Sequence, residues 1–178
     1  PVIAGTSANL STTSSSSLVF GGSSSGVIIP SSITDLNNLT INNASGVTMN
    51  SNITLASGGI LTLTSGLLNA GSNIIAVTNT SASAIAYTSG SFINVTTGAL
   101  QRTLPPGLTG TGNNYLFPIG EGGTYNAINL IDVNTGVLGP QLRASVRPTG
   151  AQTGDDTTIG PVDPRYWSLI NNNSGNFT

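Results

Sequence analysis

The residues of this chain that could do chemistry are few, and most lie in its last third. Asp155 and Asp156, with Asp163 nearby, form its acidic cluster. Carboxylates in a loop are ligands that Ca²⁺ accepts, but their spacing fits no EF-hand loop, so a solvated turn is the alternative. We therefore expect no metal and no cofactor, with calcium at these three aspartates as the one exception to test.

Two adjacent aromatic residues, Tyr166 and Trp167, are the candidate glycan contacts. Aromatic rings offer a flat apolar face with a polar edge, which suits stacking on a sugar ring. Because neighbouring residues of a strand point to opposite faces, the alternative is that one of the two belongs to the core.

The composition argues against an enzyme. The chain has no His and no Cys among its 178 residues, so the commonest general base and the thiolate metal ligands are missing. A glycosidase needs two carboxyl groups about 5–10 Å apart, whereas the repetitive half of the chain holds a single acid, Asp35. We expect no catalytic residues.

Charge and hydropathy exclude two further classes. The net charge is −2 and the four basic residues are scattered arginines, so the chain lacks the basic footprint that nucleic-acid binding requires. It also lacks a run of about 18 apolar residues that could cross a membrane.

A three-residue motif that recurs along the chain indicates which secondary-structure elements would position the candidate site residues. Each unit has three residues: an apolar residue, then in most units a threonine, then a second apolar residue. The pattern of units repeats after about 22 residues, which is typical of a solenoid. The units are Leu39-Thr40-Ile41, Val47-Thr48-Met49, Ile53-Thr54-Leu55, Leu61-Thr62-Leu63, Leu67-Leu68-Asn69 and Ile75-Ala76-Val77.

Three such strands in each coil predict a right-handed, three-faced parallel β-solenoid with about 20–22 residues per coil, over residues 1–103. Leu39 and Ile41 would point inward and Thr40 outward. The coil before them would hold Leu18-Val19-Phe20 and Val27-Ile28-Ile29, and the last would begin at Ile85-Ala86-Tyr87. An antiparallel sandwich of short hairpins is the alternative.

The threonines raise the question of ice binding, for which flat threonine arrays on a solenoid are typical. Thr40 and Thr62 would stack across one period, but we expect Thr54 to be followed by Ala76 and Thr48 by Leu68. A ladder of two rungs is too short for a regular face, so ice binding is a minor alternative.

The double proline Pro105-Pro106 marks a boundary, because proline blocks strand continuation. Beyond it the strands are longer and alternate more clearly, which predicts an antiparallel β-sandwich-like domain over residues 104–178. Its final residues, Gly175 to Thr178, look like the start of a strand, so this domain is expected to be incomplete.

Four phrases in order give the chain a family resemblance: Leu61-Thr62-Leu63-Thr64-Ser65-Gly66, Leu100-Gln101-Arg102-Thr103-Leu104-Pro105, Phe117-Pro118-Ile119-Gly120-Glu121-Gly122-Gly123-Thr124-Tyr125 and Arg165-Tyr166-Trp167. Together they resemble segments of large secreted surface proteins and adhesins of the Bacteroidota, many exported by the type 9 pathway. The resemblance departs at Glu121, where a basic residue is usual, and in the lack of a C-terminal sorting domain.

The resemblance implies an extracellular or cell-surface module within a longer polypeptide, and it implies no specific ligand. In the same group of bacteria, Asp156-Thr157-Thr158 resembles a short O-glycosylation signal, with Thr157 as the acceptor and a plain loop as the alternative.

We therefore expect a non-enzymatic structural module of an extracellular fibre or large adhesin. It would self-associate through strand and solenoid-end contacts, or join neighbouring repeats of a longer chain. A carbohydrate-binding module for surface glycans is the main alternative, and a polysaccharide-degrading β-helix enzyme is a minor one.

Overall fold

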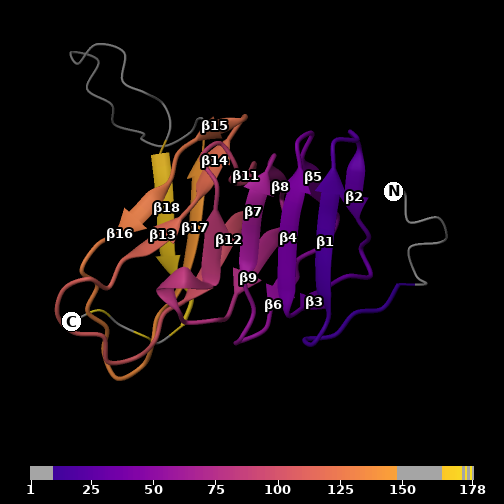
Figure 1. Cartoon of the computed structure of the whole chain (residues 1–178). Coiled ribbons are helices and arrows are strands. Elements are labelled where there is room, and N and C mark those ends of the chain that lie inside the picture. Colours follow the sequence, from indigo (N-terminus) through magenta and orange to yellow (C-terminus); the bar gives the residue numbers. More distant parts are fainter. Residues whose placement is uncertain (1–9, 148–165, 174, 176, 178) are drawn as a thin grey trace, which may run out of the picture.

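The computed structural model describes residues 10–147, 166–173, 175 and 177, and it is an all-β solenoid of about five turns with antiparallel strands attached. The coils stack along one axis, from β1 and β2 at one end to β17 and β18 at the other (Figure 1). Three sheets run along that axis.

Sheet A is wholly parallel in the order β1-β4-β7-β10. Its strands are β1 (Ser17–Gly22), β4 (Asn38–Asn43), β7 (Leu61–Ser65) and β10 (Ile85–Tyr87). A short 3₁₀ helix, η2 (Ala82–Ala84), precedes β10.

Sheet B is parallel from β2 through β5, β8 and β11 to β14, and the short β15 then pairs antiparallel with β14. Its strands are β2 (Val27–Ile29), β5 (Val47–Met49), β8 (Leu68–Gly71), β11 (Ile93–Val95), β14 (Ile119–Glu121) and β15 (Thr124–Tyr125).

Sheet C is parallel from β3 through β6 and β9 to β12, after which β17 and β18 are both added antiparallel. Its strands are β3 (Asp35–Leu36), β6 (Ile53–Leu55), β9 (Ile74–Val77), β12 (Ala99–Thr103), β17 (Gln141–Arg147) and β18 (Tyr166–Asn171). A separate antiparallel pair joins β13 (Tyr115–Phe117) to β16 (Ile128–Leu130).

The inward half of the repeat behaves as predicted. Leu39 pairs with Leu61 and Ile41 with Leu63, and all four side chains are fully buried. The apolar core follows the axis through all the coils, because each coil buries its inner face only against its neighbours. Thr40 pairs with Thr62, which confirms the expected stacking of these two residues.

The unit Leu67-Leu68-Asn69 differs by one residue from its predicted register. Leu68 pairs with Val47 and is fully buried, so Thr48 is followed by Asn69 and not by Leu68. The two coils differ at the preceding corner: the register shifts between Leu63 and Ser65, and the chain then reaches Leu68 in fewer residues than the earlier coil needs from Asn42 to Val47. The tight corner at Gly66 has a φ of +74°, and a Cβ there would overlap the Asn43 carbonyl oxygen.

The coils lengthen along the axis. Val47 pairs with Leu68, 21 residues further on, within the predicted length. Leu68 pairs with Ile93, 25 residues further on, so the later coils exceed 20–22 residues.

Asparagine side chains connect successive coils at their corners. The Oδ1 of Asn38 accepts a hydrogen bond from the backbone N–H of Ile60 at 2.9 Å, and the Oδ1 of Asn52 accepts one from Ile74 at 2.8 Å, each 22 residues further on. These bonds satisfy donors that the turns remove from the sheet ladders.

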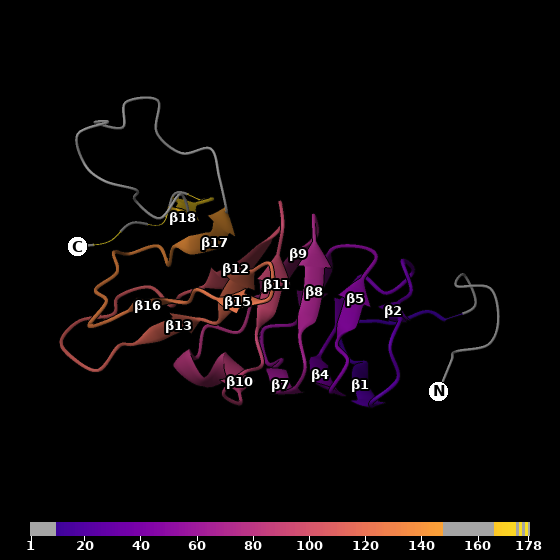
Figure 2. The same ribbon diagram turned by 90° about the horizontal axis from the view of Figure 1, so that it is seen from above.

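The sheets continue across the expected boundary between residues 103 and 104. β14 pairs with β11 in sheet B, and β17 pairs with β12 in sheet C. The antiparallel strands predicted downstream are present, and the view from above shows β17 and β18 following β12 (Figure 2). In the described part of the chain, these strands therefore extend the solenoid's own sheets.

Candidate functional site

A pocket of about 350 Å³ lies on the outer face of sheet C, over β9, β12, β17 and β18. Its described lining residues are Ser72, Ile74, Thr97, Gly98, Ala99, Arg143, Ser145, Arg147, Tyr166, Ser168 and Ile170. We call it the sheet C pocket.

The pocket is hollow because its floor is built from small residues. Ser145 pairs with Ser168 across β17 and β18, beside Ala99 on β12. Larger side chains rise on both sides of this row, since Arg143 pairs with Ile170 and Arg147 pairs with Tyr166. Residues two apart in a strand share a face, so the same alternation that buries Ala144 and Val146 places the arginines outside.

Two arginine side chains line the pocket. The guanidinium of Arg147 donates to the carbonyl oxygens of Thr96 and Thr97, each at 2.9 Å. Arg143 donates to the side-chain oxygen of Gln101 at 3.2 Å. No Asp or Glu is among the described lining residues, and Arg143 takes part in a further interaction. The serine hydroxyls of the floor, Ser145 and Ser168, form no hydrogen bond within the described part of the chain.

Aromatic rings gather at a second place, which we call the aromatic cluster: the partly exposed Tyr87, Tyr125 and Trp167 and the buried Phe92. The rings of Tyr87 and Tyr125 stack with centroids 6.3 Å apart, and Phe92 packs against Tyr125 at 5.6 Å. The indole N–H of Trp167 donates to the carbonyl oxygen of Asn126, the neighbour of Tyr125, at 3.0 Å. Tyr87, Tyr125 and Trp167 are each 43–50% exposed.

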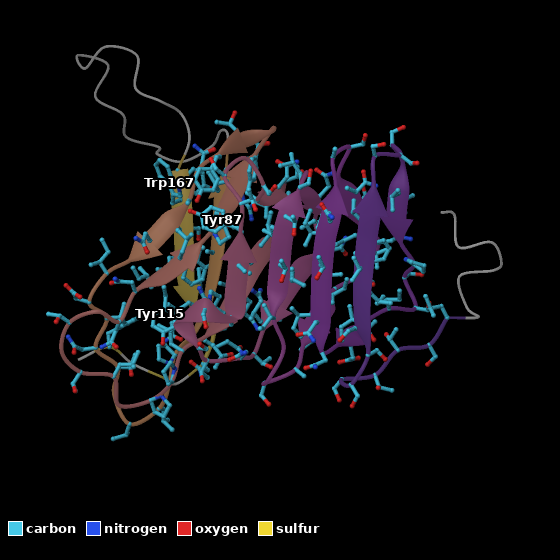
Figure 3. The ribbon with its side chains drawn as sticks, viewed as in Figure 1. Tyr87, Tyr115 and Trp167 are labelled. Atoms are coloured by element: carbon cyan, nitrogen blue, oxygen red, sulfur yellow. The ribbon has the colours of Figure 1, made fainter. Side chains whose placement is uncertain are left out.

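The β14–β15 turn positions Tyr125 in this cluster. Gly122 and Gly123 have φ of +59° and +80°, as a two-residue hairpin turn requires. The tight turn brings Tyr125 back beside β14, where its ring stacks on the ring of Tyr87. Tyr87 and Trp167 are labelled in the view with side chains (Figure 3). Burial, followed by a hydrogen bond that the Tyr125 hydroxyl donates to the Tyr87 side chain, raises the pKa of Tyr125 to about 12.

The structure separates the two residues predicted to contact glycans. Tyr166 lines the sheet C pocket, whereas Trp167 lies on the opposite face of β18 and belongs to the aromatic cluster. They do not form one platform. Sequence reasoning missed Arg143 and Arg147 as pocket residues, although the alternation of Gln141–Arg147 around buried Leu142, Ala144 and Val146 was the signal that places both arginines on one face.

Arg102 is a third unexpected feature, since its side chain is buried in the solenoid. Its guanidinium donates to the carbonyl oxygens of Leu116, Ser81 and Ala82 at 2.7–3.1 Å, and it lies 5.2 Å from the ring centroid of Tyr115. Burial lowers the pKa of Arg102 to about 10, so it stays charged at neutral pH. It joins β12 to η2 and β13, and it has no access to a ligand.

Other predicted sites cannot be placed. The calcium candidates Asp155, Asp156 and Asp163, and the O-glycosylation candidate Thr157, lie outside the described residues. Within the described ranges, no group of three or more His, Cys, Asp or Glu side chains is arranged to hold a metal ion. The same ranges contain no helix with the length and apolar character needed to cross a bilayer.

Comparisons with known proteins give no relative: no family model, curated protein or solved structure matches the chain.

Proposed function

We propose that this chain is a structural module of an extracellular fibre or large cell-surface adhesin, and that it assembles through the end of its solenoid. A single observation carries the proposal: in the described part of the chain, β1, β2 and β3 each have a neighbouring strand on one side only. Unpaired strand edges are templates for pairing with another chain.

The edge of β1 is well formed for such pairing. Ser16 and Gly22 direct their carbonyl oxygens to β4, since these accept from Asn37 and Ala44. Because peptide groups alternate along a strand, the N–H and C=O of Val19 face the outer edge. Lysine and proline, which commonly protect edges, are missing from β1, and the Val19 side chain is 71% exposed.

The test removes one edge donor without touching the core. Val19→Pro deletes an N–H that faces away from β4, a change that edge strands tolerate. Val19→Thr keeps the N–H and the strand propensity, so it is the matched control. We expect concentration-dependent oligomers or filaments in the wild type and in Val19→Thr, and their loss in Val19→Pro, by sedimentation velocity and negative-stain microscopy.

Circular dichroism must first show that all three proteins fold alike. A wild type that stays monomeric at every concentration, or a proline variant that assembles normally, would contradict the proposal.

Carbohydrate binding is the second candidate, and the aromatic cluster favours it. Three partly exposed rings on adjoining segments, with the Trp167 indole held by Asn126, offer apolar faces of the kind that stack on sugars. Trp167→Ala should abolish binding on a glycan array. Phe177→Ala is the control, because Phe177 is also 46% exposed but is not part of the cluster. Equal glycan profiles for the two variants would reject this candidate.

A further inference from the structure

We propose that two copies of this chain join first coil to first coil, as a two-fold symmetric pair in which β1 of one copy pairs antiparallel with β1 of the other. The first coil, formed by β1, β2 and β3, lies at one end of the stack (Figure 1). The inference rests on the proposed assembly through the solenoid end, and it specifies the partner and the geometry. A symmetric contact uses the same surface of both copies and closes after two, so the product is a rod of double length.

The inward side chains of the first coil are only half-buried. Leu18 and Phe20 on β1 pack against the apolar core but remain partly exposed. Their pairing partners one coil further on, Leu39 and Ile41, are fully buried. A solenoid buries the apolar residues of its last coil only when something covers that coil, and a second copy would do so here.

The opposite end of the core is covered by the chain itself. On β13, Tyr115 is 3% exposed and Phe117 is fully buried. The Tyr115 hydroxyl donates to the carbonyl oxygen of Thr80 at 3.2 Å, and Arg102 donates to that of Leu116 at 2.7 Å, so β13 is held against the preceding coil. The two ends therefore differ, and the first coil is the end that a second copy can complete.

The edge of β1 is complementary to itself. Its outward peptide groups belong to Ser17, Val19 and Gly21, because those of the residues between them face β4. Two antiparallel copies pair all three when the two-fold axis passes through Val19. Val19 then faces Val19, and Ser17 faces Gly21 of the second copy. The antiparallel direction follows from the symmetry, since a two-fold axis across the strand reverses it.

Charge does not oppose this contact. Asp35 on β3 is the only charged side chain among residues 1–101, and the Thr34 hydroxyl donates to it at 2.8 Å. A two-fold axis through β1 exchanges the positions of sheets B and C, so Asp35 approaches the neutral β2 of the second copy and not its own counterpart. The symmetric pair thereby avoids the like-charge contact that would oppose association.

Single cysteines test the geometry, because the chain has none of its own. In the proposed pair the Cα atoms of the two Val19 residues are about 5.5 Å apart, a separation that a disulfide can bridge. Val19→Cys should therefore form a covalent dimer on mild oxidation. Thr62→Cys is the matched control, since Thr62 lies in the same outward column two strands further in. Its two copies are five strand spacings, about 24 Å, apart.

We expect at least ten times more covalent dimer from Val19→Cys than from Thr62→Cys on a non-reducing gel, at equal protein concentration. Sedimentation velocity of the wild type should show monomers and dimers, with no larger species as the concentration rises. Circular dichroism of the reduced variants establishes that both are folded.

The outcomes separate this inference from the assembly on which it rests. A wild type that stays monomeric at every concentration contradicts both. Filaments that lengthen with concentration, or dimers without a Val19→Cys disulfide, support assembly but overturn the two-fold pair. A Thr62→Cys disulfide as abundant as that of Val19→Cys would place the contact on the outer face of sheet A and would overturn it as well.

Discussion

Arg102 stands in a column of the solenoid where apolar residues are the rule. Through successive strands of sheet C it is aligned with Leu36, Leu55, Val77 and Leu142, all of them buried. The arginine is tolerated there because its buried guanidinium finds acceptors in the backbone carbonyls of Ser81, Ala82 and Leu116, in η2 and β13.

Restoring the apolar column should therefore destabilise the protein. Arg102→Leu removes three hydrogen bonds from a charged donor that join β12 to η2 and β13, and because a hydrogen bond to a charged group contributes about 1.5–3 kcal/mol, we expect a loss of about 2 kcal/mol or more. Arg102→Lys keeps the charge but cannot span both partners, and should lose less. Urea denaturation measures both, and a leucine variant as stable as the wild type would show that these hydrogen bonds contribute nothing.

Tyr125 should make stability depend on pH in the alkaline range. Its pKa is raised from 10 to about 12 in the folded chain, so the unfolded chain loses that proton first. The stabilisation is complete below pH 10 and is lost as the pH rises toward 12. The absorbance of tyrosinate should show a late-titrating hydroxyl that disappears in Tyr125→Phe; an unchanged titration curve would contradict this assignment.

At the level of elements, β14 depends on a glycine for a reason other than backbone freedom. Gly120 has no room for a Cβ, because one would overlap the Thr124 carbonyl oxygen and the ring of Phe92. The close approach allows Phe92 to pack against Tyr125 and completes the aromatic cluster.

Gly120→Ala should cost about 1–3 kcal/mol, the usual range for overpacking a close contact. Gly58→Ala is the matched control, since a Cβ at Gly58 meets no atom within 4 Å and its φ is not in the left-handed region. Thermal denaturation should separate the two, and equal melting temperatures would rule out the steric role of Gly120.

The elements also show what the sequence could and could not predict. The repeat identified Leu39, Ile41, Leu61 and Leu63 as inward residues, because the spacing of two within strands and of 22 between coils are both visible locally. The register at Leu68 depends on the shift between Leu63 and Ser65 before the tight Gly66 corner, which the residue types do not reveal.

The sequence also could not predict that β17 pairs with β12, because this pairing depends on residues far apart in the chain. Alternation within Gln141–Arg147 predicts a strand but is the same for parallel and antiparallel partners, so nothing in it specifies β12. The sheet C pocket arises from that long-range pairing. The sequence therefore predicted that the pocket residues lie in strands, but it did not predict that they form a pocket.

At the scale of the molecule, the two ends of the solenoid differ. At one end β2 and β3 continue the parallel direction of their sheets, whereas at the other sheets B and C end in the antiparallel strands β15 and β18. In sheet B, a copy that stacks on the second end meets a strand of reversed direction, β15, whereas β18 of sheet C runs parallel to β12 again. We therefore expect any assembly to begin at the first coil, where Val19→Pro is placed to interrupt it.

The stacking of coils also determines how the molecule responds to a pulling force. Parallel ladders between coils direct their hydrogen bonds along the axis, so an axial load strains all the ladders in series, and they open one at a time because each opening relieves the tension on the rest. A coil of 22 residues adds about 5 Å to the stack but spans about 70 Å when extended. Held at its ends in an optical trap, the solenoid should lengthen in successive steps of that size, as an extensible tether that absorbs a sudden load.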